Sequence, residues 1–385
     1  MRYDGLELWW VDLALRQPVG TSAGTHRARP VVFVRVLAGG GDGWGECGAL
    51  PDGTAVDPAL DAVWGLLAEV VPARLGRAAA ARGGEVPPAS VVAHLFDTTP
   101  ANRMAAAVVE MAVLDLELQA AGRSLADHLG VPDQVRAGGP GGGVPAGAVV
   151  GIPDDGRLRT LVAAVGRQVD RGYGRVRVKI RPGWDVAPLA ALRDAFPDLV
   201  LQADANAAYR VDDAGRLAEL DDLGIGCLEQ PLAAADLAGH ADLAGRLATP
   251  IGLDESLTTV RAVADAIRYG ACRVACLKPA RLGGLLAARR AQDRCRQAGV
   301  SAFVGGLFET GLGRTANAVL SGLPGLDLPG DLSDPSDYLV DNPAPYPRPV
   351  GGRVPLPAVP GVGSRPDRHA LSQLGALVER FDRAG

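Results

Sequence analysis

Lysine is scarce in this chain. Of the 39 basic residues among 385, only Lys179 and Lys278 are lysines, and the other 37 are arginines. An arginine side chain stays protonated in proteins, whereas a lysine with a lowered pKa can act as a base. The two remaining lysines either have a chemical role or are ordinary surface charges. Their positions in the fold must decide between these two interpretations.

Other features are also missing, and each absence excludes a class of protein. The net charge is −5 and no run of basic residues occurs, so we expect neither nucleic acid nor an anionic membrane as a partner. No apolar stretch approaches the roughly 18 residues of a membrane span. Asp4, Glu7 and Asp12 lie where a secretory signal would be apolar. We therefore expect a soluble, cytoplasmic protein.

The cysteines and histidines do not form the pattern of a disulfide scaffold or a zinc site. There are five of each, with no C-x-x-C and no H-E-x-x-H, and an odd number of cysteines cannot pair completely. We interpret the cysteines as small, buried apolar residues.

The first third of the chain predicts an α+β domain. Residues 5–14, 30–37 and 44–46 are typical of strands, and apolar residues recur with helical spacing over 57–78 and 102–129. We place a capping domain at 1–137. Residues 20–27, between the first two strands, are small and polar, which favours a solvated connection, with a mobile lid as the alternative. The glycine cluster 138–143 lacks a following Gly-Lys-Ser/Thr and predicts a flexible connector rather than a phosphate loop.

After the glycine cluster, the sequence pattern changes to short apolar runs that alternate with amphipathic helical stretches. Strands are predicted at 146–152, 176–180, 199–205, 225–230, 250–255, 272–278, 301–305 and 326–331, and helices at 185–196, 211–223, 235–247, 258–269, 284–298 and 311–323. This α/β pattern favours a (β/α)8-type barrel over 138–341. The segment 342–385, rich in proline and glycine before a helix expected at 368–383, is predicted to return to the capping domain.

Five charged residues recur at the ends of successive strands. Lys179, Asp204, Glu229, Asp254 and Lys278 are separated by 25, 25, 25 and 24 residues, so each βα unit brings one charge to the edge where barrels build active sites. Charges in apolar strands are costly unless they are paired or bind a metal. Three carboxylates without histidine or cysteine favour Mg²⁺. The alternative is an ion network closed by the two lysines, which would leave a surplus negative charge. A substrate bound to the metal would lie between the lysines.

Longer motifs surround these positions. They are VKIRPGWD at 178–185, DAN at 204–206, EQPL at 229–232, LDES at 253–256, LKP at 277–279, GGLFETGLGR at 305–314 and LPGD at 328–331. With these motifs the chain resembles the enolase superfamily, muconate-lactonizing subgroup, and within it the o-succinylbenzoate synthase and N-succinylamino acid racemase family. The likeness extends along most of the chain, including the helix expected around 104–118. It implies an enolase-like, modified TIM barrel with a capping domain, and a homo-oligomer.

The resemblance also implies a chemistry. Asp204, Glu229 and Asp254 would bind Mg²⁺, which holds the carboxylate of a small-molecule substrate, and Lys179 would remove the proton α to that carboxylate to give an enediolate. In the leading hypothesis, an o-succinylbenzoate synthase of menaquinone biosynthesis dehydrates 2-succinyl-6-hydroxy-2,4-cyclohexadiene-1-carboxylate. Lys179 returns its proton to the leaving hydroxyl while Lys278 stabilises the intermediate.

Other activities stay open. The first alternative is N-succinylamino acid (N-acylamino acid) racemase, in which the two lysines are the two bases, either alone or together with the synthase activity. Further alternatives are another muconate-cycloisomerase-like enzyme and a catalytically inactive barrel.

Two arginines are expected to lower the pKa of the lysines. Arg177 stands where the family commonly has the first lysine of Lys-x-Lys, and it supplies a positive charge near Lys179 but cannot exchange a proton. Arg281 is expected to do the same for Lys278. Val149 stands where the family often has a serine.

Further supporting residues are expected around the strand ends. Asn206 and Gln230 closely follow metal ligands and are expected to support them. Glu309 and Asp331 are expected to orient or neutralise Lys278, with helix capping as the alternative for Glu309. The lid candidates are Thr21, Ser22, His26 and Arg27; His26 and Arg27 would meet a distal carboxylate, or else belong to a solvated loop.

Overall fold

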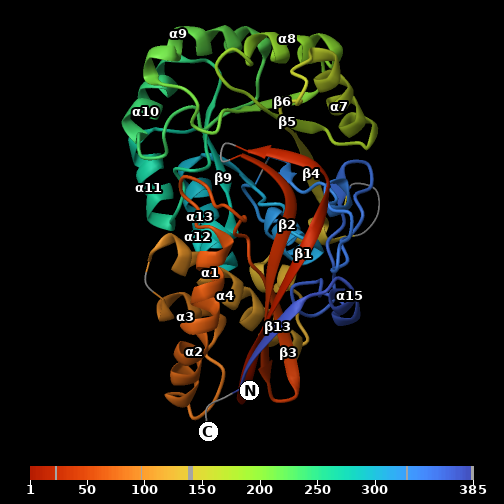
Figure 1. The fold of residues 1–385 in the computed structure, drawn as a ribbon. Helices are drawn as coiled ribbons and strands as arrows, with labels where there is room; N and C mark the ends of the chain where they lie inside the picture. Colours follow the sequence, from red (N-terminus) through yellow and green to blue (C-terminus); the bar gives the residue numbers. More distant parts are fainter. Residues whose placement is uncertain (22–23, 97, 138–141, 327, 383–385) are drawn as a thin grey trace.

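The N-terminal part of the protein is a four-stranded antiparallel sheet covered by helices (Figure 1). The computed structural model describes residues 1–21, 24–96, 98–137, 142–326 and 328–382. The sheet has the strand order β13-β1-β2-β3. Its strands are β1 (Tyr3–Thr21), β2 (Gly24–Ala38), β3 (Gly41–Glu46) and β13 (Leu377–Asp382). The helices are α1 (Leu60–Glu69), α2 (Val71–Ala80), α3 (Ala89–Val92), α4 (Pro100–Ala120), α5 (Leu125–Leu129) and α6 (Asp133–Arg136), with a 3₁₀ turn η1 (Ala93–Leu95).

Helix α4 packs closely against strand β3. The helix begins at Pro100, and the side chain of Thr99 accepts a hydrogen bond from the backbone N–H of Asn102, which caps its first turn. Gly43 and Gly45 of β3 face the helix, and a Cβ atom at either position would collide with a carbonyl oxygen of α4. These glycines therefore let the helix backbone approach the sheet.

The rest of the chain forms a (β/α)8 barrel. Eight parallel strands are hydrogen-bonded in the order β10-β9-β8-β7-β6-β5-β4-β11. The backbone N–H of Leu328, which lies near β11, donates a hydrogen bond of 3.5 Å to the backbone oxygen of Ala302 in β10. This contact brings the two ends of the sheet together. The strands are β4 (Val144–Val150), β5 (Arg175–Lys179), β6 (Val200–Asp204), β7 (Leu228–Glu229), β8 (Ile251–Leu253), β9 (Val274–Leu277), β10 (Ser301–Val304) and β11 (Gly330–Asp331), and β12 (Arg353–Val354) pairs with β4.

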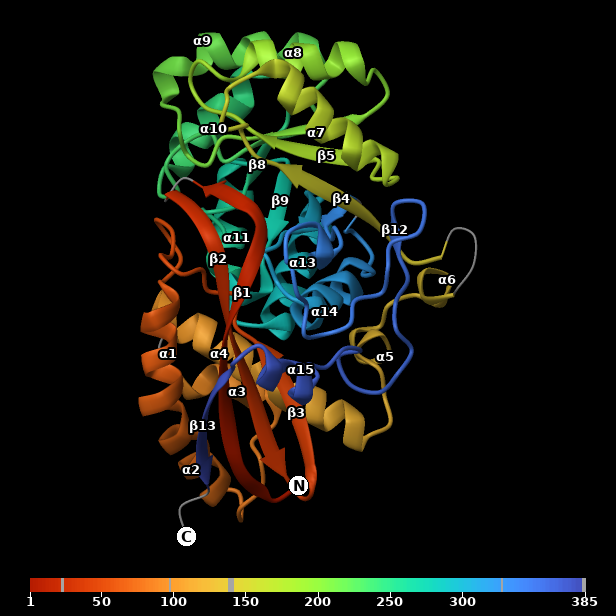
Figure 2. The same ribbon diagram turned by 45° about the vertical axis from the view of Figure 1, so that its right-hand side comes forward.

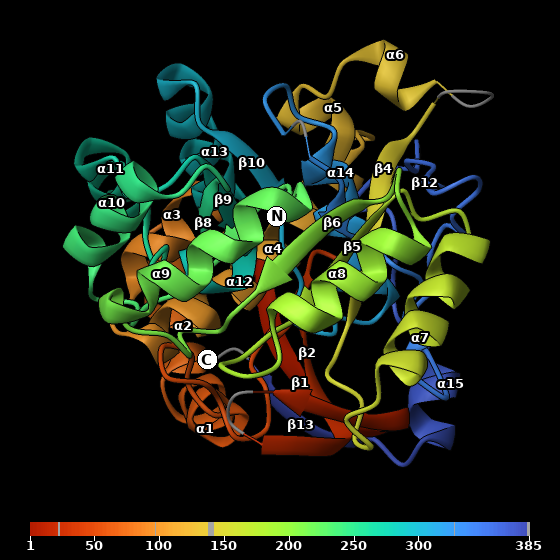
Figure 3. The ribbon, with the colours of Figure 1, turned by 90° about the horizontal axis from the view of Figure 1, so that it is seen from above.

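Helices surround the strands of the barrel (Figure 3). They are α7 (Leu158–Asp170), α8 (Val186–Ala195), α9 (Ala214–Leu217), α10 (Leu237–Arg246), α11 (Val260–Tyr269), α12 (Pro279–Leu282), α13 (Leu285–Ala298) and α14 (Gly311–Ser321), with 3₁₀ turns η2 (Val211–Asp213), η3 (Ala218–Leu223) and η4 (Pro335–Asp337), and α15 (Arg368–Gln373) follows in the tail. Figure 2 shows β1 and β2 reaching from the N-terminal sheet towards the barrel. Among the described residues, no helix has the length and apolar character needed to cross a membrane.

The predicted barrel strands are confirmed, and three local predictions need correction. Helix α7 was not predicted, although Leu158, Leu161, Val162, Val165 and Val169 recur with helical spacing. The helix expected over 211–223 is broken into η2, α9 and η3. The expected loop 20–27 is largely hairpin, since β1 and β2 remain paired as far as Thr21 and Gly24.

The C-terminal prediction was partly wrong. Helix α15 ends at Gln373, and Gly375 has a φ of +74°, a conformation that ends helices. The chain then continues as β13, which pairs antiparallel with β1 from Gly5↔Asp382 to Trp10↔Leu377. Its last segment therefore lies on the N-terminal sheet. The domain boundaries themselves stay predictions, and the one at 138 falls within 138–141, outside the described residues.

Candidate active site

The five charged strand-end residues lie at one edge of the barrel. Lys179, Asp204 and Glu229 are the last residues of β5, β6 and β7, and Lys179 is in register with Asp204, which is in register with Glu229. Asp254 and Lys278 directly follow β8 and β9. Because parallel strands place equivalent ends side by side, the regular spacing in the sequence becomes a cluster in space.

Each lysine is ion-paired with one carboxylate of this cluster. The Nζ of Lys179 lies 2.7 Å from Oδ2 of Asp204 and 2.8 Å from Oδ1 of Asn206. The Nζ of Lys278 lies 2.7 Å from Oδ2 of Asp254. The lysine side chains are 23% and 10% exposed, respectively, whereas both aspartates are fully buried. The two amines thus reach the carboxylates from different strands.

Arg177 occupies the centre of the cluster. Its Nη1 donates to both carboxylate oxygens of Glu229, at 2.6 and 2.5 Å, and its Nη2 donates to Asp331 at 2.5 Å. Arg175 also donates to Asp331, at 2.9 Å. The expected positive charge beside β5 is therefore present, but it is paired with three carboxylates, those of Glu229, Asp331 and, at 3.8 Å, Asp204. Asp331 is hydrogen-bonded to the two arginines rather than to Lys278.

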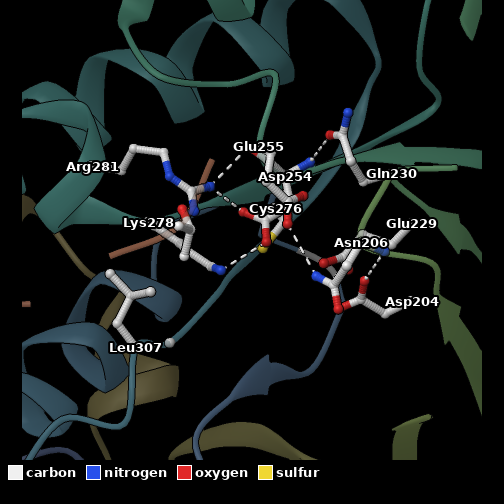
Figure 4. A network of polar contacts seen from close by, with 12 residues as sticks. Asp204, Asn206, Glu229, Gln230, Asp254, Glu255, Cys276, Lys278, Arg281 and Leu307 are labelled. Atoms are coloured by element: carbon white, nitrogen blue, oxygen red, sulfur yellow. Dashed lines mark hydrogen bonds and ion pairs between the residues drawn. The ribbon is translucent and has the colours of Figure 1, made fainter. Parts of the chain in front are cut away.

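Arg281 lies on the far side of Asp254. Its Nη1 donates to the backbone oxygen of Asp254 at 3.0 Å and to Oδ1 of the same residue, while Oδ2 holds Lys278. Figure 4 shows Lys278 and Arg281 approaching Asp254 from one side, with Asp204, Asn206 and Glu229 on the other. The guanidinium also makes two hydrogen bonds to Asp57, at 2.7 and 2.6 Å. The expected neighbour of Lys278 is thus in place.

Asn206 and Gln230 hold the loops that follow the carboxylates. The backbone N–H of Asn206 donates to Asp204 at 3.0 Å. The side-chain oxygen of Gln230 accepts hydrogen bonds from the backbone of Asp254 and Ser256, at 3.0 and 3.1 Å. Both residues have a left-handed backbone, with φ of +41° and +40°, which turns the chain away directly after a strand end. Both residues thus contact the segments that carry the carboxylates, and their role in supporting metal ligands stays a prediction.

Glu309 lies elsewhere than predicted. Its carboxylate accepts from the backbone of Leu307 at 2.8 Å and from Asn317 at 3.0 Å, and it pairs with Arg314 at 3.2 Å. It neither contacts Lys278 nor caps a helix; Thr310 caps α14 instead.

The lid predictions receive little support. Ser22 lies outside the described residues, and so do the side chains of Thr21 and His26, although their backbone belongs to the hairpin. Arg27 is exposed.

Two acidic residues of the site were not predicted. Glu255 is half-buried, accepts a hydrogen bond from Asn206 at 3.0 Å, and keeps one buried oxygen without a hydrogen-bond partner among the described residues. Its position directly after Asp254 was the available signal. Asp57 comes from the loop between β3 and α1 and is 224 residues away from Arg281 in sequence, so no local pattern pointed to it.

The cluster perturbs the ionisation of its members. Burial raises the pKa of Glu229 to about 8 against the pull of Arg177, and Asp204 and Asp254 raise it further. Burial also opposes the charge of Asp254, but Arg281 and Lys278 hold the pKa of that carboxyl below its usual range. Burial disfavours the ammonium of Lys278, yet Asp254 holds its pKa above the ordinary value. The lowered lysine pKa expected from sequence is therefore not found for Lys278 in this ion-paired arrangement.

The donor atoms fit a hard divalent cation. Within the described part of the chain, carboxylate oxygens of Glu229 and Asp254 and the Sγ of Cys276 all lie within 4.8 Å of one another. Burial raises the pKa of Cys276, so it is a neutral thiol and a poor ligand. Carboxylate oxygens remain, the preferred ligands of Mg²⁺. Arg177 contacts the oxygens of Glu229, and Lys278 and Arg281 contact those of Asp254. A metal site and a self-contained ion network both stay predictions for this cluster.

A cavity of about 590 Å³ opens onto this cluster. Its walls include both lysines, Asn206, Glu255 and Arg281 from the barrel. Gln17, Pro18, Leu50, Thr54 and Asp57 from the N-terminal part of the chain, and Val149 at the end of β4, also line it. A cavity of this size takes a small organic molecule. Its polar groups are amines, guanidinium groups and carboxylates, which suits a substrate that carries carboxylates and exchanges a proton.

Comparisons with known proteins agree with this architecture. Residues 7–130 match the family "Mandelate racemase / muconate lactonizing enzyme, N-terminal domain", and residues 160–370 match "Enolase C-terminal domain-like". The chain is 42% identical over 379 residues to an N-succinylamino acid racemase of Amycolatopsis sp, covering 97% of the chain and 98% of that protein. It is 35% identical over 375 residues to an o-succinylbenzoate synthase of Geobacillus kaustophilus, covering 97% and 96%. A crystal structure of an enolase superfamily member from Listeria innocua superimposes with a TM-score of 0.90 at 29% identity, with both chains fully covered.

Proposed function

The chain belongs to the enolase superfamily and, within it, to the family of o-succinylbenzoate synthases and N-succinylamino acid racemases, and on this premise we propose that it is a Mg²⁺-dependent o-succinylbenzoate synthase. It is an enzyme with a small-molecule substrate. The proposed reaction is the dehydration of 2-succinyl-6-hydroxy-2,4-cyclohexadiene-1-carboxylate in menaquinone biosynthesis. A cytoplasmic location and a homo-oligomeric state stay predictions.

One observation carries the proposal. The only two lysines of a 385-residue chain both line the same cavity, where each contacts a different carboxylate of one cluster. The other 37 basic residues of the chain are arginines, whose side chains stay protonated and cannot act as bases. A pair of amines placed this way suits proton transfer at a carbon held between them.

The three carboxylates Asp204, Glu229 and Asp254 are proposed to hold Mg²⁺. When bound, the ion would supply positive charge to the substrate carboxylate as a second negative charge develops on it. The raised pKa of Glu229 supports this assignment, because it marks a carboxylate whose charge Arg177 compensates only in part. Asn206 and Gln230 would keep the ligand loops in place.

Lys179 is proposed to act as acid and base in the dehydration. As a neutral amine it takes the α-proton, and the electron pair of the C–H bond passes into the enediolate. The C–O bond of the hydroxyl then breaks, and the Lys179 ammonium returns the same proton to the departing oxygen, so that water leaves. Lys278 stays charged and stabilises the enediolate from the opposite side. Its raised pKa suits this role.

The second candidate is N-succinylamino acid racemase, either instead of the synthase activity or alongside it. It is favoured by the higher identity to the Amycolatopsis racemase, 42% against 35% for the Geobacillus synthase, and by the presence of both amines. In this reaction one lysine removes the α-proton and the other delivers a proton to the opposite face. Lys278 must then be neutral for one direction, which the pairing with Asp254 disfavours.

Arg177 is proposed to support the site rather than exchange protons. Its guanidinium joins Glu229 to Asp331 and lies 5.6 Å from the ring centre of Phe303. It thereby lowers the cost of ionising Glu229 and holds the carboxyl in position.

The purified protein should be assayed with both substrates, with Mg²⁺ and after removal of metal by a chelator. We expect metal-dependent loss of the cyclohexadiene absorbance, and any racemase activity is read by chiral chromatography of N-succinylamino acids. Lys179→Ala should lower both activities about 10³-fold. Turnover of neither substrate by the metal-loaded protein would reject both candidates and favour an inactive barrel or another cycloisomerase-like reaction.

A further inference from the structure

Asp57 is a buried carboxylate that the N-terminal part of the chain contributes to the barrel. It lies between β3 and α1 and is only 5% exposed. Its two oxygens accept hydrogen bonds from Nε and Nη2 of Arg281, at 2.7 and 2.6 Å. This two-pronged contact fixes both the position and the plane of the guanidinium.

The orientation of Arg281 decides what its third nitrogen can reach. With Nε and Nη2 held by Asp57, Nη1 points to the backbone oxygen and Oδ1 of Asp254. The other oxygen of Asp254 is the hydrogen-bond partner of Lys278. A continuous chain of contacts therefore runs from Asp57 through Arg281 and Asp254 to one lysine.

The other lysine has no such connection. Lys179 contacts Asp204 and Asn206, and Asn206 in turn contacts Glu255, all of which belong to the barrel. Among the described residues, the side chain of Asp57 is hydrogen-bonded to Thr54 and Arg281 and not to this group. Within the part of the chain that the structure describes, Asp57 thus reaches the charge network through Arg281, on the side of Lys278.

We propose that Asp57 is a positioning residue that tunes Lys278 alone, by holding Arg281 against Asp254. The inference rests on the proposed function, because it assigns the two lysines separate tasks. If Arg281 is released, Oδ1 of Asp254 loses its cationic partner, so the carboxylate holds the amine of Lys278 more tightly through Oδ2 and the amine becomes less available to a substrate. Seating of the N-terminal loop on the barrel would then control one face of the reaction and leave the other unchanged.

The central variant is Asp57→Asn, which keeps the size of the side chain but places an NH₂ group against a guanidinium donor. Thr54→Ala is a milder second variant, because the Thr54 hydroxyl donates to Asp57 at 3.1 Å and accepts from its backbone N–H at 2.9 Å. It carries the test if Asp57→Asn fails to fold. Asp61→Asn, at an exposed position of α1, is the matched control.

The first measurement is α-proton exchange in D₂O, with each enantiomer of an N-succinylamino acid supplied separately. Lys278→Ala identifies the enantiomer whose exchange depends on Lys278. We expect Asp57→Asn to slow the exchange of that enantiomer about tenfold, the cost of one hydrogen bond between charged groups, and to leave the other within about twofold. An equal loss for both enantiomers, or no loss, would overturn the proposal.

The second measurement needs no substrate, so it separates this inference from the proposed function. Because the chain has only two lysines, limited acetylation followed by peptide mass spectrometry reports the reactivity of each amine. We expect Asp57→Asn to slow labelling of Lys278 several-fold and Thr54→Ala to slow it less, with Lys179 unchanged in both. Unchanged labelling of Lys278, or parallel changes at the two lysines, would refute the role of Asp57. An unreactive wild type in the enzyme assay would reject only the proposed function.

Discussion

The buried carboxyl of Glu110 should make the stability of this protein depend on pH. Glu110 lies on α4, is 2% exposed, and accepts hydrogen bonds from the backbone of Leu285 and Leu286, at 2.7 and 3.0 Å, at the start of α13. Burial raises its pKa from 4.5 to about 7, although these two hydrogen bonds act in the opposite direction. Such a shift corresponds to about 3 kcal/mol of unfolding free energy.

The sign follows from the direction of the shift. A raised pKa means that the folded protein binds the proton more tightly than the unfolded chain, so the contribution is fully present below pH 4.5 and is lost as the pH rises through 7. Glu110→Gln does not titrate, but its NH₂ group faces one of the two backbone N–H donors, so the variant starts with a pH-independent loss of stability. Relative to the wild type, its stability should therefore rise by about 2.5 kcal/mol between pH 5 and pH 8.

Urea unfolding followed by tryptophan fluorescence, at several pH values from 5 to 8, measures this difference. Glu69→Gln, at an exposed position of α1, controls for the loss of one negative charge. A difference between Glu110→Gln and wild type that stays constant with pH, or that grows in the opposite sense, would refute the reasoning.

Three further predictions concern the cluster. Lys179→Ala should lower kcat of both reactions about 10³-fold, which is the usual contribution of a general acid–base group. Lys278→Ala should abolish racemisation and only slow dehydration. Steady-state assays of the folded variants measure both effects, and equal effects of the two substitutions would contradict the separate roles. Glu229→Gln should weaken Mg²⁺ binding more than about tenfold in isothermal titration calorimetry, and an unchanged affinity would remove Glu229 from the ligand set. Arg177→Met should destabilise the fold by about 3–5 kcal/mol, because it leaves Glu229 and Asp331 without their shared partner, and an unchanged melting temperature would argue against that pairing.

The architecture was largely predictable from sequence because it rests on local periodicity. Short apolar runs separated by amphipathic helices predicted the barrel strands, and their regular spacing predicted which charges would share an edge. Helix α7 was missed although its apolar residues recur with helical spacing, so nothing physical stood in the way of predicting it. Strand β13 escaped because its pairing partner, β1, lies at the other end of the chain, and strand formation there depends on that distant edge rather than on its own sequence.

The sequence predicted which residues form the site better than it predicted which of them contact one another. The sequence placed Lys278, Asp254 and Arg281 near one another, since they follow neighbouring strands. It could not show that Asp57, 224 residues earlier, determines how Arg281 is oriented. Nor could it show that Asp331 pairs with Arg175 and Arg177, because opposite charges in a crowded cluster have several possible partners, and only side-chain geometry selects among them.

A crystal structure of the protein with Mg²⁺ and o-succinylbenzoate is the most direct test of the proposed mechanism. We predict an ion bound by carboxylate oxygens of Asp204, Glu229 and Asp254 at about 2.0–2.1 Å, with Lys179 and Lys278 on opposite faces of the ligand next to its metal-bound carboxylate. An ion bound elsewhere, or both amines on one face of the ligand or turned to solvent, would contradict the account.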